Sequence, residues 1–333
     1  MLLNRFGGNS KLVFTLLVVI AIVSFLIAIS SGTVDFTITE SVKAIFVNDD
    51  SMQRLIVFDL RLPRVLTAGL VGIGLALSGA MLQGLMRNNM ASPSIIGVTS
   101  GASFIGYLTL VVFPRSYYLL TPATIIGAFL TTMLIYRLAY QRGVSPVKMI
   151  LSGIAVSAIF GAFNDIIKLF YSEDIANATG FIIGGFNGVV WKHFFILFPF
   201  TLIALIATVF LPTYMNVLLL GDDVAGSLGL NVQRFRLLLI VISSLLAGSA
   251  VAISGLIGFV GLVVPHITRM LLGSDYKHLF PGSVLIGFSL MIMCDTIGRI
   301  ILPVGEIPVG IIMAAIGAPF FLYLLRTRET RGV

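Results

Sequence analysis

Charged residues are scarce in this sequence. Asp, Glu, Lys and Arg make up 11% of the 333 residues, whereas hydrophobic residues make up 58% and the mean hydropathy is +1.07. A soluble globule of this size needs far more polar surface than this composition supplies. The scarcity therefore excludes a soluble protein and favours a polytopic α-helical membrane protein, for which the lipid bilayer is the solvent.

Cysteine and histidine are also nearly absent. The single cysteine, Cys294, excludes an intrachain disulfide and a site with several cysteine ligands. The three histidines, His193, His266 and His278, lie far apart and lack a ligand spacing such as His-x-x-x-His. We therefore predict structural or interfacial roles for the histidines and no metal bound by this chain.

Three functional motifs are missing. There is no Gly-x-x-x-x-Gly-Lys-Ser/Thr loop and no Gly-Lys dipeptide, so any ATP and Mg²⁺ that drive transport must bind a separate subunit. There is no His-Glu-x-x-His motif of an intramembrane metalloenzyme, and we predict no catalytic residues. The 21 Lys and Arg residues form no basic tract, which argues against nucleic acid as a partner.

Long apolar runs are abundant, and a membrane-spanning helix needs roughly 20 apolar residues. Ten runs bounded by charge, Pro or Gly occur at 12–31, 64–84, 94–113, 121–140, 147–170, 192–211, 236–254, 258–272, 281–298 and 308–325. We predict an all-α fold of about ten transmembrane helices in one membrane domain covering residues 1–333. The first run could be misread as a signal peptide, but it is longer than a usual signal-peptide core, which favours a retained span.

The distribution of basic residues predicts the orientation. Ten spans place both termini on one side, and a cytoplasmic N-terminus puts thirteen of the 21 basic residues inside. By the positive-inside rule, both termini are expected in the cytoplasm, with the chain in the cell membrane. The thirteen residues are Arg5, Lys11, Arg87, Arg137, Arg142, Lys148, Arg234, Arg236, Arg269, Lys277, Arg326, Arg328 and Arg331.

Two segments are too polar to read as simple spans. Residues 32–60 carry several acidic residues and are expected outside. Residues 213–236 are expected on the cytoplasmic side, where their glycines predict two short helices with a break between them. Such a segment is a plausible docking surface for a soluble partner.

Two carboxylates in the apolar runs have basic neighbours at helical spacing. Lys168 lies three residues after Asp165, and Arg299 lies four residues after Asp295. Pairs of this kind usually stabilise a helix. The alternative, an ion relay in a secondary transporter, would require lone ionisable groups at the midplane and two inverted halves, and neither is evident.

Glycine is frequent inside the apolar runs. The second run alone contains Gly69, Gly72, Gly74, Gly79 and Gly84. In lipid, small residues let helix backbones approach closely, so we expect this run to be tightly packed.

Several short motifs occur in a specific order along nearly the whole chain. They are RLPR at 61–64, RNNMASP at 87–93, LLLGD at 218–222, SGLIGFVGLVVPH at 254–266, EIPVG at 306–310 and GAPF at 317–320. In this order and spacing they resemble the permease subunits of type II ABC importers, the family that takes up ferric siderophores, haem and cobalamin.

The resemblance implies an assembly. It comprises two permeases around a central pathway, two cytoplasmic ATP-binding subunits and an extracytoplasmic substrate-binding protein. The second permease is either another copy of this chain or a related chain. Residues 1–333 would then form a single permease domain, with a coupling-helix loop at about 213–236.

The resemblance also implies three groups of site residues. Docking of the binding protein is expected at Arg61, Arg64 and Arg299. Coupling to the ATPase is expected at Gly221, Asp222, Ala225 and Gly229, with Asp222 where the family commonly has Glu. The inner mouth of the pathway is expected at Gln83, Asn88, Asn89 and Met90, although Asn-Asn-Met replaces the usual Asn-Pro-Leu.

The resulting hypothesis is a permease that translocates ferric siderophores into the cytoplasm. Haem and cobalamin are the alternative cargoes, and an ion-coupled secondary transporter is the alternative mechanism.

Overall fold

The computed structural model describes residues 10–32, 34–47, 50–113, 115, 119–140, 146–171 and 175–329. Of the residues used to predict the orientation, Arg5, Arg142 and Arg331 lie outside this described part. The helices are α1 (Ser10–Ser30), α2 (Ile38–Phe46), α3 (Met52–Arg54), the π-helix η2 (Leu55–Arg61), α4 (Leu62–Met86), α5 (Val98–Val112), α6 (Leu120–Ala139), α7 (Pro146–Phe170), α8 (Ile175–Ile183), α9 (Trp191–Phe210), α10 (Pro212–Leu219), α11 (Asp222–Ser227), α12 (Val232–Ser254), α13 (Val260–Leu272), α14 (Tyr276–Ile300) and α15 (Val309–Glu329).

The predicted all-helical membrane fold is confirmed, and each of the ten apolar runs coincides with one helix. Within the described residues, seven helical segments are long and apolar enough to cross a membrane. Three further apolar helices are shorter, at Val98–Val112, Val260–Leu272 and Val309–Leu324. The number of spans and the cytoplasmic side therefore stay predictions.

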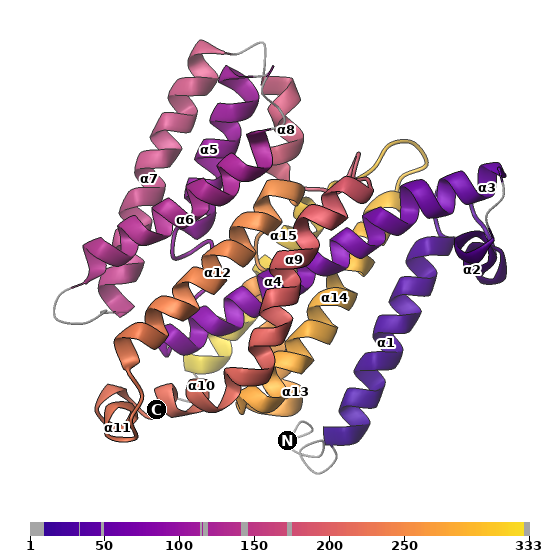
Figure 1. The fold of residues 1–333 in the computed structure, drawn as a ribbon. Coiled ribbons are helices and arrows are strands. Elements are labelled where there is room, and N and C mark those ends of the chain that lie inside the picture. Colours follow the sequence, from indigo (N-terminus) through magenta and orange to yellow (C-terminus); the bar gives the residue numbers. More distant parts are fainter. Residues whose placement is uncertain are drawn as a thin grey trace.

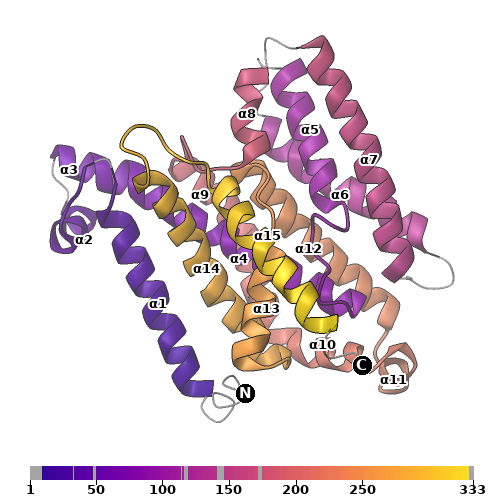
Figure 2. The same ribbon diagram turned by 180° about the vertical axis from the view of Figure 1, so that it is seen from behind.

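The two ends of the bundle differ (Figures 1 and 2). One end carries α2, α3 and the start of α4, and we call it the α2 end. The other end carries α10, α11, the start of α1 and the end of α15, and we call it the α11 end. The start of the first helix and the end of the last helix therefore lie at the same end of the bundle, as they must if the chain crosses the membrane an even number of times.

Helix α4 lies at the centre of the bundle. It packs against α9, α12, α13 and α14, and nearly all of its residues are buried (Figure 1). A Cβ on Gly72 would lie 2.1 Å from the Gly287 carbonyl oxygen of α14, and a Cβ on Gly79 would lie 1.9 Å from the Gly261 carbonyl oxygen of α13. The backbones thus approach too closely for any side chain, which confirms the tight packing expected of this run.

The segment before α4, predicted as polar and external, is helical. Helices α3 and η2 run directly into α4 and form one continuous helical stretch, Met52–Met86. Pro63 has no N–H, and its ring crowds the carbonyl of the preceding turn. The wider π-helical turn, in which the Leu62 N–H bonds to the Val57 carbonyl, accommodates this proline without breaking the helix.

Helices α5 to α8 form a group beside the central helices (Figures 1 and 2). Backbone hydrogen bonds join the end of α8 to its neighbours. Leu256 N donates to the Phe181 carbonyl at 3.0 Å, and Gly310 N donates to the Gly184 carbonyl at 3.0 Å. These bonds hold α8 between the end of α12 and the start of α15.

The close approach at Gly79 yields a stability test. Gly79→Ala forces a Cβ into the α13 backbone, and overpacking of this kind costs about 1–3 kcal/mol. Thermal unfolding in detergent can be followed with a thiol-reactive dye, because the only cysteine, Cys294, is buried until the chain opens. We expect a lower unfolding midpoint for Gly79→Ala.

The matched control is Gly74→Ala in the same helix. Its Cβ would meet its nearest neighbours at 3.8 Å, an ordinary contact. Equal unfolding midpoints for both variants would contradict the packing argument.

Candidate functional site

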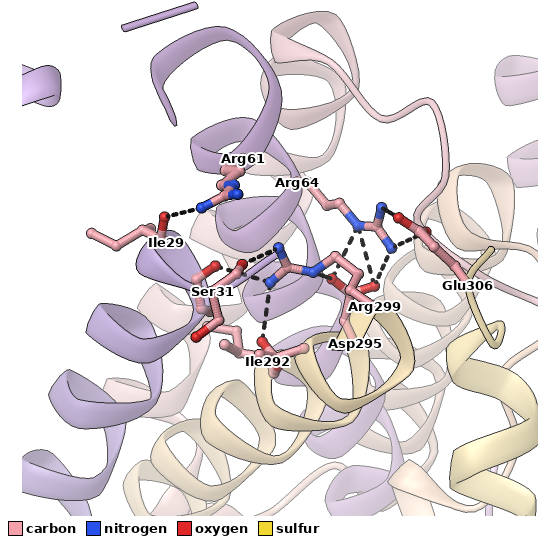
Figure 3. Close-up of polar contacts among 10 residues, drawn as sticks. Ile29, Ser31, Arg61, Arg64, Ile292, Asp295, Arg299 and Glu306 are labelled. Carbon is pink, nitrogen blue, oxygen red and sulfur yellow. Dashed lines mark hydrogen bonds and ion pairs between the residues drawn. The ribbon is translucent and has the colours of Figure 1, made fainter. Parts of the chain in front are cut away.

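A cluster of five charged side chains lies at the α2 end (Figure 3). Arg61 comes from η2, Arg64 from the first turn of α4, and Asp295 and Arg299 from the last turns of α14; Glu306 lies in the loop before α15. Three positive and two negative groups therefore meet where two stretches that are far apart in sequence, 61–64 and 295–306, converge.

Asp295 is the centre of this cluster. Arg64 approaches it as a fork, with Nη2 at 2.8 Å from Oδ1 and Nε at 3.0 Å from Oδ2. Arg299 Nε lies 3.2 Å from the same Oδ2. Because the Asp295 side chain is only 3% exposed, its charge is compensated almost entirely by these two guanidinium groups.

Arg64 also binds Glu306. Its Nη1 donates to Oε1 at 3.1 Å, and its Nη2 lies 2.9 Å from Oε2. A single guanidinium thus links α4 to both α14 and the loop before α15 (Figure 3).

The other two arginines bind the end of α1. Arg61 Nη1 donates to the carbonyls of Ile29 at 3.1 Å and Ser30 at 2.8 Å. Arg299 Nη2 donates to the Ala28 carbonyl at 2.9 Å. The last four carbonyls of a helix lack partners within the helix, so these cations satisfy them and also complement the negative end of the helix dipole.

These contacts differ from what was expected of Arg61 and Arg299. Both were expected to face acidic residues of a binding protein, but they are 6% and 7% exposed and their donors point at the main chain of α1. Arg64, expected to dock in the same way, lines a cavity at this end. The structure thus brings the three predicted docking arginines together, while docking itself stays a prediction.

The predicted coupling residues lie in and around the short helix α11. Gly221 joins α10 to α11 with φ +110°, and Gly229 follows α11 with φ +86°, backbone conformations that favour glycine. Ala225 is fully buried. The expected pair of short helices is present, and the coupling role stays a prediction.

Asp222 fastens α11 to two of the long helices. Its Oδ1 lies 2.8 Å from Arg236 Nη2 of α12 and 3.5 Å from Arg87 Nη2 at the end of α4. Arg236 is 2% exposed, so the pair with Asp222 compensates a buried charge. Sequence spacing gave no sign of either partner, because the contacts join segments 14 and 135 residues apart.

The predicted gate residues lie beside this link. Gln83 is buried, donates from Nε2 to the Gly261 carbonyl at 3.1 Å and accepts from Arg269 through Oε1. Gln83 and Asn89 both line a cavity of about 160 Å³, together with Arg87, Leu219, Arg269, Ser274 and Tyr276.

The gate residues after α4 form a turn. Arg87 ends α4 in a left-handed conformation, and Asn88 accepts the Met90 N–H through Oδ1 at 2.9 Å. The loop and the Asp222–Arg87 pair are therefore adjacent, and the gating role stays a prediction.

A second contact joins the short helices to the bundle. Asn216 of α10 donates from Nδ2 to Asp275 Oδ1 at 2.7 Å, and Asp275 also accepts the Lys277 N–H at 2.9 Å and caps α14. The pKa of the Asp275 carboxyl is lowered below its ordinary value. The hydrogen bond from the Lys277 backbone N–H has the largest effect, and the hydrogen bond from the Asn216 amide has the next largest.

The second predicted pair of a carboxylate and a basic neighbour is also present. Asp165 pairs with Lys168 at 2.9 Å, as the spacing predicted, and is 74% exposed. Within the described ranges no group of three or more His, Cys, Asp or Glu side chains could hold a metal ion.

Comparison with known proteins gives consistent matches. The sequence profile of the FecCD transport family matches residues 20–327. The Fe(3+)-citrate import system permease protein YfmD of Bacillus subtilis (strain 168) is 38% identical over 97% of each chain. The cobalamin import system permease protein BtuC of Halobacterium salinarum is 39% identical over 84% of this chain and 76% of its own length. An inward-facing structure of a metal-chelate type ABC transporter is 33% identical, covers 95% of this chain and 99% of its own, and superposes with a TM-score of 0.86.

The buried cluster predicts a large effect of removing Asp295. Asp295→Asn keeps the shape of the side chain but leaves two guanidinium groups without their carboxylate, which costs about 3–5 kcal/mol when an ion pair is buried. We expect a markedly lower unfolding midpoint in the Cys294 labelling assay.

Asp165→Asn is the control, because it removes an exposed pair worth at most about 1 kcal/mol. A loss for Asp295→Asn no greater than for Asp165→Asn would show that the cluster does not stabilise the α2 end.

Proposed function

This chain belongs to the FecCD transport family, and on that premise we propose that it is the permease subunit of a binding-protein-dependent ABC importer that translocates ferric siderophores into the cytoplasm. The observation that carries the proposal is the agreement over nearly the whole chain, with a family match at residues 20–327 and a structural match covering 95% of it. A separate subunit would bind ATP and Mg²⁺ and hydrolyse the nucleotide.

A metal chelate is the cargo that the relatives favour. The ferric-citrate permease and the metal-chelate transporter both match nearly the full length of this chain. Cobalamin is the second candidate, because the cobalamin permease is equally similar in sequence over a shorter range.

The α11 end offers the surface proposed for the ATPase. Leu220, Val224 and Leu228 follow one another at intervals of four residues and are all exposed, whereas Ala225 faces inward. This apolar stripe lies on α11 and the turns before and after it, outside the spans, where an exposed apolar surface is costly unless a partner covers it. Asp222 would transmit movement of α11 to Arg87, next to the predicted gate loop.

The α2 end is proposed for the binding protein. Arg64 is the residue of the predicted docking group that borders a cavity, so it is the candidate for direct contact. Arg61 and Arg299 would act indirectly by fixing the end of α1. A second permease, either a copy of this chain or a related one, would complete the pathway.

Uptake measurements test the transport proposal. In cells lacking this chain, accumulation of at least one radiolabelled ferric siderophore is expected to fall to background and to return with the wild-type gene. Cobalamin and ferric citrate serve as parallel substrates. If only cobalamin uptake depends on this chain, cobalamin is the cargo and the siderophore proposal is wrong. If a proton ionophore abolishes uptake while ATP stays constant, the mechanism is ion-coupled transport.

Substitutions in the apolar stripe test the coupling surface. Val224→Lys combined with Leu228→Lys places two charges where we propose an apolar contact, and central interface positions of this kind cost about 2 kcal/mol or more. We expect loss of the co-purifying ATPase and of ATP-dependent uptake, without a change in the unfolding midpoint of the isolated chain.

Ser227→Lys is the matched control, since Ser227 is an exposed residue of α11 outside the stripe. Retention of the ATPase by the double variant would reject this surface.

A further inference from the structure

A cavity of about 640 Å³ lies at the α2 end between α6 and α9, above the last turn of α12. It is separate from the predicted gate residues, which line the small cavity at the α11 end. The volume is in the range of small-molecule sites, which is typically about 300–1,000 Å³. Of the predicted site residues only Arg64 borders this cavity, at its mouth, and the proposed docking of the binding protein leaves its interior without an assigned occupant.

The lining changes from polar to apolar along the helices. Lys192 and His193 are in the first turn of α9, followed on the same face by Ile196 and Phe200. Helix α6 contributes Leu120, Thr121 and Pro122 from its first turn and Ile125 from the next. Since these turns start at the α2 end, the cavity has a polar mouth and an apolar interior, which suits an amphipathic molecule with its polar group at the membrane surface.

The polar mouth has an excess of donors. Arg64 and Glu306 line it but neutralise each other at 2.9 Å. Lys192 is exposed and has no carboxylate partner within the described part of the chain. His193 accepts the Val190 N–H through Nδ1 at 3.1 Å, so the neutral ring carries its proton on Nε2 as a donor. An anionic group fits this mouth.

The interior adjoins lipid-facing surfaces. Ile126, next in sequence to the lining residue Ile125, is 56% exposed, and Phe195, next to the lining residue Ile196, is 66% exposed. The outer faces of α6 and α9 continue as exposed apolar residues toward the α11 end. The two helices that flank the cavity therefore present exposed apolar side chains on their outer faces, as helices in contact with acyl chains do.

We propose that this cavity binds a phospholipid of the leaflet at the α2 end. Lys192, His193 and the Asn187 amide hold the phosphate, and the start of one acyl chain lies between Ile125 and Phe200. The proposal depends on the chain being embedded in a membrane and not on the identity of the cargo, so a wrong cargo would leave it intact.

Native mass spectrometry of the full chain tests this site, with dioleoyl phosphatidylglycerol added to delipidated protein in detergent. Lys192→Glu reverses the charge at the mouth, and Ile125→Trp fills the interior. Each is expected to weaken the first lipid adduct at least about tenfold, the effect of losing a charged hydrogen bond or the apolar space. Lys43→Glu, an exposed charge reversal at the same end, and Ile126→Trp, on the outward face, are expected to leave the adduct unchanged.

The unfolding midpoint measured with Cys294 identifies any variant that fails to fold. For that case, Phe200→Trp provides a second filling variant. The proposal is overturned if wild-type protein holds no discrete adduct, if all variants bind lipid equally, or if millimolar inorganic phosphate displaces the adduct, because free phosphate would then be the ligand.

Discussion

The close approach of α4 to its neighbours is the constraint on which the rest of this structure depends. In lipid, apolar side chains gain little by leaving their solvent, so helices associate through tight packing and polar contacts. Gly72 and Gly79 permit backbone-to-backbone contact of α4 with α14 and α13, and this contact fixes α4 between the two helices. Arg64 lies at one end of α4 and Arg87 at the other, so one helix positions the candidate sites at both ends of the bundle.

The ion pairs at the two ends of the bundle differ in their exposure to water. At the α2 end Asp295 is buried between Arg64 and Arg299, and Arg61 and Arg299 also satisfy the carbonyls of α1. Breaking such a cluster leaves a buried charge without compensation. At the α11 end the Asp222–Arg87 pair is about 40% exposed on both sides, which makes it easier to break and re-form than the pair between Asp222 and the buried Arg236.

Local patterns predicted most of the fold. Every apolar run became a helix because hydropathy over about 20 residues decides that outcome, and the pairs Asp295–Arg299 and Asp165–Lys168 followed from helical spacing. The destinations of Arg61 and Arg299 could not be predicted, since their carbonyl partners lie 31 and 271 residues away and main-chain acceptors leave no mark in a sequence. The cavity between α6 and α9 could not be predicted either, because the residues that line it come from segments far apart in the sequence.

One oxygen atom links α11 to two of the long helices. Arg87 and Arg236 both bind Oδ1 of Asp222, so α4 and α12 share a single acceptor on the short helix. Displacing α11 must either release that oxygen or draw the end of α4 with it. The length of the Asp222 side chain therefore works as a spacer, and a relative with Glu at this position must hold its short helix one methylene farther from the bundle or change the angle at which it lies.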